Sequence, residues 1–201
     1  SDVCSSDLDT MLTTQGFLVS SSFLESPVSG GFSWIAEATF LTGRWIQSQT
    51  VYDTLLESEA ESIPRYLQSA GYHTLLSMPA LIKGGWPEGI GFYGFDDYLY
   101  HPDFAYRGPP FTYVPVPDQF AVFKAHDRLL ANREAHDQPV FIQHVLVSSH
   151  APFDLVPAFV AEWERLGDGT IYFDLDNSSF DNNWVSGNEY DEGYSAAIRY
   201  V

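Results

Sequence analysis

The pattern of apolar positions predicts a helix followed by a buried strand in the middle of the chain. Apolar residues recur at helical spacing over 63–70, where Ser62 is a natural cap, Pro64 stands early in the helix and Gly71 ends it. The next residues, 72–78, form an apolar run typical of a buried strand. A helix, a glycine and then a strand is the order expected of an α/β fold.

The same patterns predict further elements on both sides of this pair. The run 139–147 is apolar on both faces, which indicates a central parallel strand. The other expected elements are a helix end at 12–15 broken at Gly16, a short strand at 17–24, a helix at 33–42 closed by Gly43, a helix at 118–134 capped by Asp118, and a helix from Tyr190 to Val201. We therefore expect an α/β/α sandwich around a mostly parallel sheet.

Two long segments lack this periodicity. Residues 79–117 are rich in glycine, proline and aromatic residues, which favours an ordered loop region packed against the sheet edge. Residues 157–187 are polar and irregular, and 57–61, with three glutamates, is typical of a solvated helix start. The Asp-rich stretch 174–179 lacks the glycine and final glutamate of a calcium loop.

Composition narrows the class of protein. With 45% hydrophobic and 16% aromatic residues in 201, the chain has enough apolar side chains for a substantial core. The formal net charge of -18, with 9 Lys and Arg, argues against a nucleic-acid partner or an anionic membrane surface. No apolar run is long enough for a membrane span, and no secretory signal pattern is present.

The first eight residues do not fit the rest of the chain. Residues 1–8, which include the single cysteine Cys4, resemble the translation of a common sequencing adapter. We treat 1–8 as non-native and 9–201 as the domain. Without Cys4 the chain offers no disulfide, thiolate metal site or cysteine nucleophile.

Ser33 is the first candidate for chemistry. It follows a Ser-Pro-Val-Ser-Gly-Gly turn and opens the expected helix 33–42, where backbone N–H groups favour an anion. Ser33 is thus either a nucleophile that also ligates a metal or an N-cap. The paired Gly30 and Gly31 favour the first interpretation, because they allow backbone or substrate to approach closely.

His150 and Arg107 are candidates for substrate binding. His150 lies just past the expected strand 139–147, and ligands of open α/β sheets gather at the carboxyl ends of strands. It is either a ligand of a charged substrate oxygen or a loop histidine bonded to backbone. Arg107 either holds an anion or stacks on rings, and His144 is expected to be a satisfied core residue.

Several segments in this order resemble the sulfatase-like branch of the alkaline phosphatase superfamily, which includes lipoteichoic acid synthase-like and phosphoethanolamine transferase-like proteins. The segments are Ser26-Pro27 through Gly43, Ala70-Gly71-Tyr72-His73-Thr74, Gly91-Phe92-Tyr93-Gly94-Phe95-Asp96, Pro117-Asp118-Gln119, and Ser148-Ser149-His150-Ala151-Pro152-Phe153. The resemblance implies an alkaline phosphatase-like α/β/α sandwich, a metal-ligating nucleophile at Ser33 and phosphate or sulfate binding at His150.

The resemblance also implies a metal-dependent phosphoester hydrolase or phospho-group transferase. Its cofactor would be a divalent metal, such as manganese, magnesium, zinc or calcium, and its substrate a small-molecule or lipid-linked phosphoester. The parent protein would lie at the cell membrane, anchored by missing N-terminal spans, with its catalytic domain on the periplasmic or extracellular face.

Departures from the family pattern limit these expectations. The sulfatase signature C-x-P-S-R is absent, which favours phosphorus chemistry over a sulfuric ester hydrolase. The family's other metal ligands match no residue here, so we expect a domain that is incomplete at both ends and inactive alone. The alternative is a non-catalytic domain of the same fold that binds a sugar or lipid head group through its aromatic loops.

Overall fold

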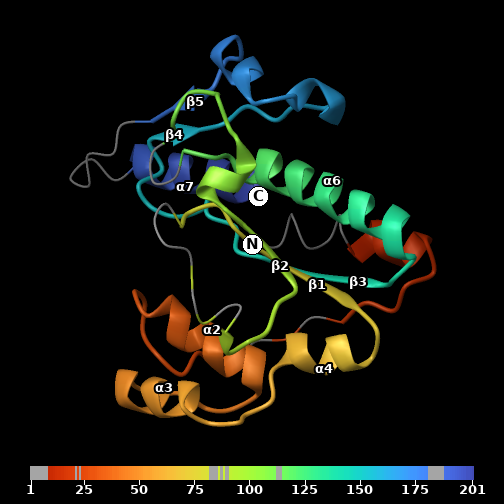
Figure 1. Ribbon diagram of the computed structural model, residues 1–201. Helices are drawn as coiled ribbons and strands as arrows, with labels where there is room; N and C mark the ends of the chain where they lie inside the picture. The colour runs from red at the N-terminus through yellow and green to blue at the C-terminus, as the bar shows by residue number, and fades with distance from the viewer. Residues whose placement is uncertain are drawn as a thin grey trace.

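A parallel sheet with helices on both faces forms the centre of the molecule (Figure 1). The computed structural model describes residues 9–20, 22, 24–81, 86, 88, 91–111, 115–180 and 188–201; the side chains of 132–136 and 188–190 are not described. Within these residues the sheet has the order β2-β1-β3, with β1 (His73–Met78) between β2 (Asp97–Tyr100) and β3 (Val140–His144). Both pairings are parallel.

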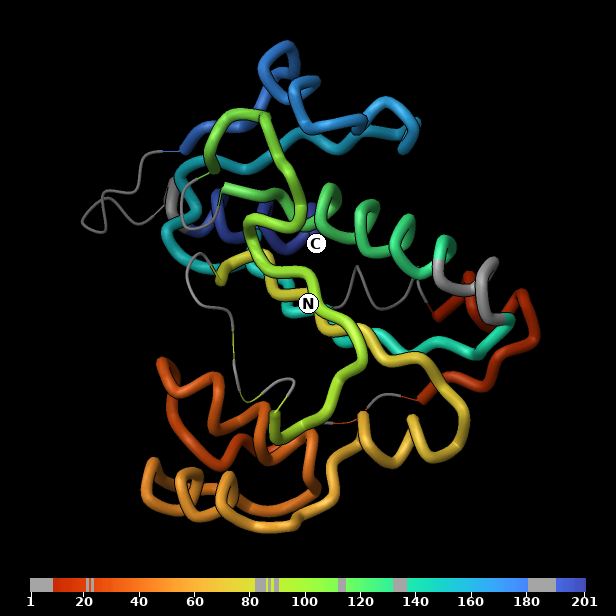
Figure 2. The backbone as a smooth tube through the Cα atoms, viewed as in Figure 1, coloured from red at the N-terminus to blue at the C-terminus, as the bar shows by residue number. Residues whose placement is uncertain are grey.

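One layer of helices covers the lower face of the sheet in Figure 1. It consists of α2 (Ser33–Thr42), α3 (Gln49–Leu56) and α4 (Ile63–Ser69). The buried apolar residues of α2 and α3 form a core with Leu76 of β1. The orange and yellow part of the backbone trace shows these helices on one side of the sheet (Figure 2).

A second layer covers the opposite face. Helix α6 (Asp118–His136) packs Phe120, Ala121 and Ala125 against Leu75 of β1. Helix α7 (Asn188–Tyr200) lies on the same side and packs Ala197 against Val156. The remaining elements are η1 (His101–Phe104), β4 (Leu155–Val156), η2 (Trp163–Leu166), η3 (Thr170–Phe173) and β5 (Ser178–Ser179), with β4 and β5 antiparallel.

These layers confirm the expected fold class. Leu75 and Leu76 are both fully buried, and they belong to the cores on opposite faces of the sheet. Successive side chains of a strand point to opposite faces, so a doubly covered strand must be apolar at neighbouring positions. That requirement explains why β1 reads as a continuous apolar run.

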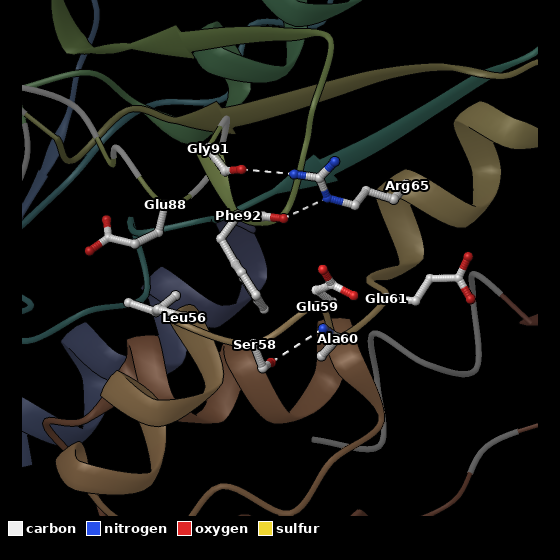
Figure 3. Close-up of a pocket in the computed structure, with 9 residues that line it drawn as sticks. All are labelled: Leu56, Ser58, Glu59, Ala60, Glu61, Arg65, Glu88, Gly91 and Phe92. Atoms are coloured by element: carbon white, nitrogen blue, oxygen red, sulfur yellow. Dashed lines mark hydrogen bonds between the residues drawn. The ribbon is translucent and has the colours of Figure 1, made fainter.

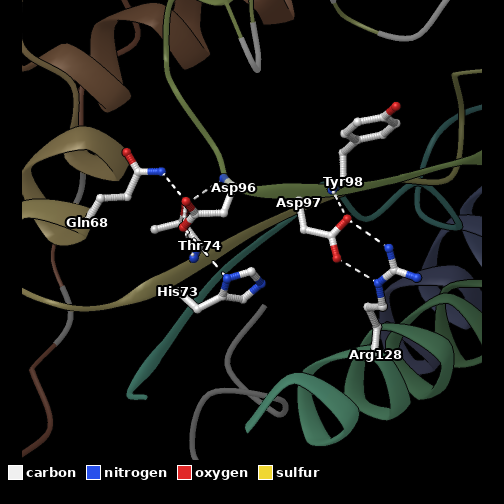
Figure 4. Close-up of polar contacts among 7 residues, drawn as sticks. All are labelled: Gln68, His73, Thr74, Asp96, Asp97, Tyr98 and Arg128. Atoms are coloured by element: carbon white, nitrogen blue, oxygen red, sulfur yellow. Dashed lines mark hydrogen bonds and ion pairs between the residues drawn. The ribbon is translucent and has the colours of Figure 1, made fainter. Parts of the chain in front are cut away.

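Polar contacts fix the ends of β1 and β2 (Figure 4). The Asp96 carboxylate accepts hydrogen bonds from the backbone N–H and the hydroxyl of Thr74, at 2.9 and 3.0 Å, and another from Gln68 of α4 at 2.6 Å. The Asp97 carboxylate pairs with both nitrogens of the Arg128 fork on α6. Partial burial raises the pKa of Asp97, but the bonds from Arg128 and Tyr98 outweigh it and lower the value.

The helix ends follow the expected chemistry in most places. Gly43 and Gly71 have φ of 63° and 88°, a left-handed conformation that glycine adopts without strain. Ser62 caps α4 by accepting from the N–H of Arg65 at 3.3 Å. Helices α4, α6 and α7 confirm the predicted segments, and 9–14 is helical up to the turn at Gly16.

The strand predicted at 17–24 is wrong for the residues described there. The described part of this segment is not in a strand, and Phe17, Leu18 and Leu24 are exposed. A strand is stabilised by pairing of its backbone groups with a neighbour, and no described strand pairs with this segment. Apolar character alone was therefore a poor guide here.

Two segments predicted without regular structure contain elements. Strand β2 and η1 lie within 79–117, and η2, η3 and β5 lie within 157–187. The helix start predicted at 57–61 is wrong, because these residues link the end of α3 at Leu56 to the start of α4 at Ile63. Ser48 caps α3 by accepting from the N–H of Val51 at 3.4 Å. Nearby Gly, Pro and acidic residues hid these short elements from a periodicity argument.

Strand β3 is shorter than predicted and lies at an edge of the described sheet, not at its centre. Its pairing with β1 continues to Val145, whose N–H donates to the backbone carbonyl of Ser77 at 2.9 Å. The N–H groups of Val147 and Ser148 donate to Asp118 and leave the ladder. Asp118 therefore binds this strand end, whereas the sequence predicted a cap of its own helix.

The described residues contain no helix that is both long and apolar enough to cross a membrane. Residues 1–8, which we interpret as non-native, lie outside the described part.

Replacing Leu75 with alanine tests the doubly covered strand. We expect L75A to lower the free energy of unfolding by about 2–5 kcal/mol, because it leaves a cavity in a closed core. L18A makes the same change at a fully exposed position and should change stability by less than about 0.5 kcal/mol. Urea unfolding followed by circular dichroism measures both, and equal effects would contradict the assignment of Leu75 to the core.

Candidate functional site

Ser33 is the first residue of helix α2 and is exposed. Phe32 stands at the N-cap position, and no side chain of the described residues caps the helix there. The alternative prediction that Ser33 is an N-cap is therefore wrong, because Ser33 lies one residue later. The first N–H groups of a helix carry partial positive charge, so the Ser33 hydroxyl lies beside a region that favours an anion.

Gly31 shapes the turn before Ser33. Its φ is 93°, which L side chains rarely adopt. A Cβ placed at Gly30 or Gly31 would meet no atom within 4 Å. Position 31 thus favours glycine because of its backbone conformation, and not because another protein group packs closely against it.

Glu37 attaches helix α2 to the sheet one turn after Ser33. Its carboxylate accepts a hydrogen bond of 2.8 Å from the side-chain amide of Gln143, near the carboxyl end of β3. Trp34 adds a second tie by donating to Gln49 at the start of α3 at 3.0 Å. These contacts hold the start of α2 at the carboxyl edge of the sheet, where α/β proteins bind ligands.

Glu37 is a site residue that the sequence analysis missed. Burial raises the pKa of its carboxyl, and the bond from Gln143 only partly offsets that effect. The sequence did hold a signal for Glu37: a charged residue four positions after Ser33, on an otherwise uncharged helix. The buried residues of this helix are all apolar, namely Ile35, Ala38 and Leu41. Residues four apart lie on the same side of a helix.

His144 and Ser77 form a second polar feature at this edge, on the face covered by α6. The two residues are partners in the β1–β3 register. Within the described residues, neither ring nitrogen of His144 nor the Ser77 hydroxyl has a hydrogen-bond partner, although all three atoms are buried. His144 is therefore not the satisfied core residue that the sequence predicted, and burial lowers its pKa to about 4.

His150 lies in the loop that leaves β3. Its side chain is exposed, its backbone N–H donates to Val147 at 2.9 Å, and its Nδ1 lies 2.5 Å from the carbonyl oxygen of Ala151. A carbonyl can only accept, so this contact places a proton on Nδ1. Ser33 and His150 thus belong to segments at the same edge of the sheet.

Arg107 lies elsewhere. It is exposed, follows η1, and its backbone N–H donates to the carbonyl of Asp168 between η2 and η3 at 2.8 Å. Hydrogen bonds from Thr170 and the nearby Arg107 charge lower the pKa of Asp168. Among the described residues no hydrogen bond or ion pair joins Ser33, His150 and Arg107 to one another.

A cavity of about 760 Å³ lies beside α4, away from these residues (Figure 3). Glu59, Glu61 and Glu88 are among its lining residues, and Arg65 donates to the carbonyl oxygens of Phe92 and Gly91 at 2.7 and 2.8 Å. None of the three predicted site residues lines it. Two nitrogens of the guanidinium are bonded to backbone carbonyls, and the three glutamates make the described lining unfavourable for an anionic substrate.

A divalent metal does not fit the described residues alone. They contain no group of three or more His, Cys, Asp or Glu side chains placed to hold a metal ion. Ser33 would supply one oxygen, whereas metal sites of this kind need several ligands. A complete cage would require residues outside the described part.

Comparison with known proteins identifies the fold. No family model matches the chain, and no curated protein sequence matches it. A solved structure that it resembles is that of the lipoteichoic acid synthase LtaP from Listeria monocytogenes, with a TM-score of 0.53 and 20% identity over 87% of this chain and 38% of that one. A protein in the alkaline phosphatase superfamily from Vibrio parahaemolyticus aligns with a TM-score of 0.35 and 19% identity over 69% and 31% of the two chains.

The likeness to the first structure shows that this chain has the alkaline phosphatase-like fold that the sequence predicted. The chain spans about two fifths of that structure's length. At this identity the likeness extends to the fold and leaves the chemistry to be argued from the residues.

Substitution of Glu37 tests its burial. A carboxyl whose pKa is raised by folding contributes most stability below its unfolded value, near pH 4, and that contribution is lost as pH rises through the folded value. The glutamine of E37Q does not ionise and so does not lose this contribution. The unfolding free energy of E37Q minus that of the unmodified chain should therefore increase from about pH 4 upward.

Urea unfolding at a series of pH values measures this difference. The exposed Glu59 provides the control, because E59Q removes one negative charge from the same acidic chain without burial. A difference curve for E37Q that is flat, or that matches E59Q, would show that the Glu37 carboxyl is not buried as described.

Proposed function

We propose that this chain is part of a metal-dependent phosphoester hydrolase or phospho-group transferase with Ser33 as its nucleophile. The observation that carries the proposal is the position of Ser33, at an uncapped helix start that Glu37 and Gln143 hold to the carboxyl edge of the sheet. The fold shared with a lipoteichoic acid synthase supports it.

The helix start suits a reaction at a phosphate. The Ser33 hydroxyl would lose its proton to solvent as its oxygen bonds to phosphorus and the bond to the leaving oxygen breaks, and the leaving oxygen would take up a proton from solvent. Water or an acceptor alcohol would then attack the phosphoserine, and the serine oxygen would leave and regain a proton. Negative charge develops on the phosphoryl oxygens during this step, and the N–H groups at the start of α2 favour it. The metal implied by the family resemblance would need ligands beyond the described residues, so we assign it no step.

His150 is proposed to bind the substrate phosphate. Its ring is exposed at the sheet edge, and the proton on Nδ1 is directed to the Ala151 carbonyl. With one proton on Nδ1, Nε2 would donate a hydrogen bond to a phosphoryl oxygen when the ring carries a second proton there. Arg107, whose backbone N–H donates to the carbonyl of Asp168, is a second proposed anion ligand.

The proposed substrate is a phosphoester on a small molecule or a lipid head group. The proposed setting is the outer face of the cell membrane, with a longer protein carrying the missing ligands and the anchor. A sulfate ester is disfavoured because the serine stands without the C-x-P-S-R signature.

Replacing Ser33 in the longer protein that carries this sequence tests the nucleophile. With manganese and nitrophenyl phosphate mono- and diesters, S33A should reduce turnover by at least about 1,000-fold, because it removes the attacking oxygen. S33T keeps a hydroxyl and should retain part of the activity. Release of nitrophenol measures all variants.

Ser29 gives the matched control, since it is an exposed serine in the preceding turn. S29A should keep full turnover. Metal-dependent turnover that survives S33A would refute the nucleophile, and absence of any turnover in the unmodified protein would favour a binding domain of the same fold.

A further inference from the structure

The loop that carries His150 is held at both ends by two consecutive residues at the start of α6. Asp118 and Gln119 are 2% and 5% exposed, so both are buried polar side chains. Asp118 binds the chain before His150, and Gln119 binds it after β4. Burying such groups costs free energy unless each finds partners, and both do.

Asp118 holds the incoming end of the loop. Its Oδ2 accepts from the N–H of Ser148 at 2.7 Å, and Val147 donates to both carboxylate oxygens at 2.9 and 3.0 Å. The bond is reciprocal, because the N–H of Asp118 donates to the Ser148 hydroxyl at 3.1 Å. These contacts fix the backbone two and three residues before His150.

Gln119 holds the outgoing end. Its amide nitrogen donates to the carbonyl of Val160 at 2.7 Å, and its amide oxygen accepts from the N–H of Val160 at 2.9 Å. An amide that pairs with both backbone groups of one residue fixes that residue in position and orientation. The loop containing His150 therefore starts and ends on one rigid helix start.

A carboxylate is the appropriate group at position 118. Both of its oxygens face backbone donors, and a carboxylate has only acceptors to offer them. An asparagine would set its NH₂ group against the N–H of Val147 in one orientation, and against the N–H groups of both Val147 and Ser148 in the other. The negative charge also lies at the start of α6, where the helix dipole favours it.

We propose that Asp118, supported by Gln119, is a positioning residue that sets where His150 meets the substrate phosphate. This inference rests on the proposed function, because it assigns Asp118 a role through His150. It does not require Asp118 to touch the substrate. His150 follows the anchored Ser148 by two positions, so fixing the backbone of Val147 and Ser148 limits where its ring can lie.

The first experiment needs no activity and uses the present chain. Amide hydrogen exchange by NMR should be at least about tenfold faster at Val147 and Ser148 in D118N than in the unmodified chain, because an NH₂ group replaces one of the two acceptor oxygens and faces these donors. D127N removes the same charge from an exposed position of α6 and should leave these amides unchanged. Unchanged exchange in D118N would overturn the anchor.

The second experiment is a double-mutant cycle in the longer protein. H150A should raise KM for a nitrophenyl phosphoester by about tenfold, as expected for loss of one charged hydrogen bond. D118N should raise KM in the same direction, and it should add little in the H150A background. S148A removes only the return bond, so it should give a smaller effect, and it keeps the test available if D118N does not fold.

The outcomes separate the two proposals. If D118N and H150A raise KM by independent, multiplicative factors, Asp118 does not act through His150 and the positioning role is wrong. If H150A itself leaves KM and turnover unchanged, the proposed function of His150 fails, and the positioning role falls with it, even where exchange confirms the anchor. A drop in turnover with unchanged KM in D118N would indicate lost folded protein and would also count against positioning.

Discussion

Strand β1 is covered on both faces, and the layers on either side depend on that arrangement. Leu76 packs into the core with α2 and α3, and Leu75 packs into the core with α6. Burial removes the backbone N–H and C=O groups of β1 from water, and hydrogen bonds to β2 and β3 satisfy them instead. Because all three strands are parallel, their carboxyl ends meet at one edge, and that edge receives the polar residues discussed above.

Two polar ties convert this sheet into a framework for a site. The Glu37 to Gln143 bond fixes α2 on one face, and the Asp118 carboxylate fixes the end of β3 on the other. Burial raises the pKa of both carboxyls, so each is held at a cost in stability. Hydrogen bonds offset part of that cost, and placement of groups at a site is a common reason for keeping such residues.

The unpartnered atoms of Ser77 and His144 also lie at this edge. Buried polar atoms in proteins are normally hydrogen-bonded, so their neighbourhood within the described part is incomplete. The chain spans 38% of the lipoteichoic acid synthase structure that shares its fold.

The sequence by itself determined the fold class and the main helices, because their periodicity and their Ser, Pro and Gly signals are local. It also located His150 beyond the end of β3, whereas the strand predicted before Ser33 is wrong for the residues described there. Tertiary structure decided what local signals cannot contain: that β3 lies at an edge, that 17–24 has no strand partner in the described part, and that Asp118 binds another segment instead of capping its own helix. Glu37 became a site residue only when folding brought α2 against Gln143, 106 positions away in the chain.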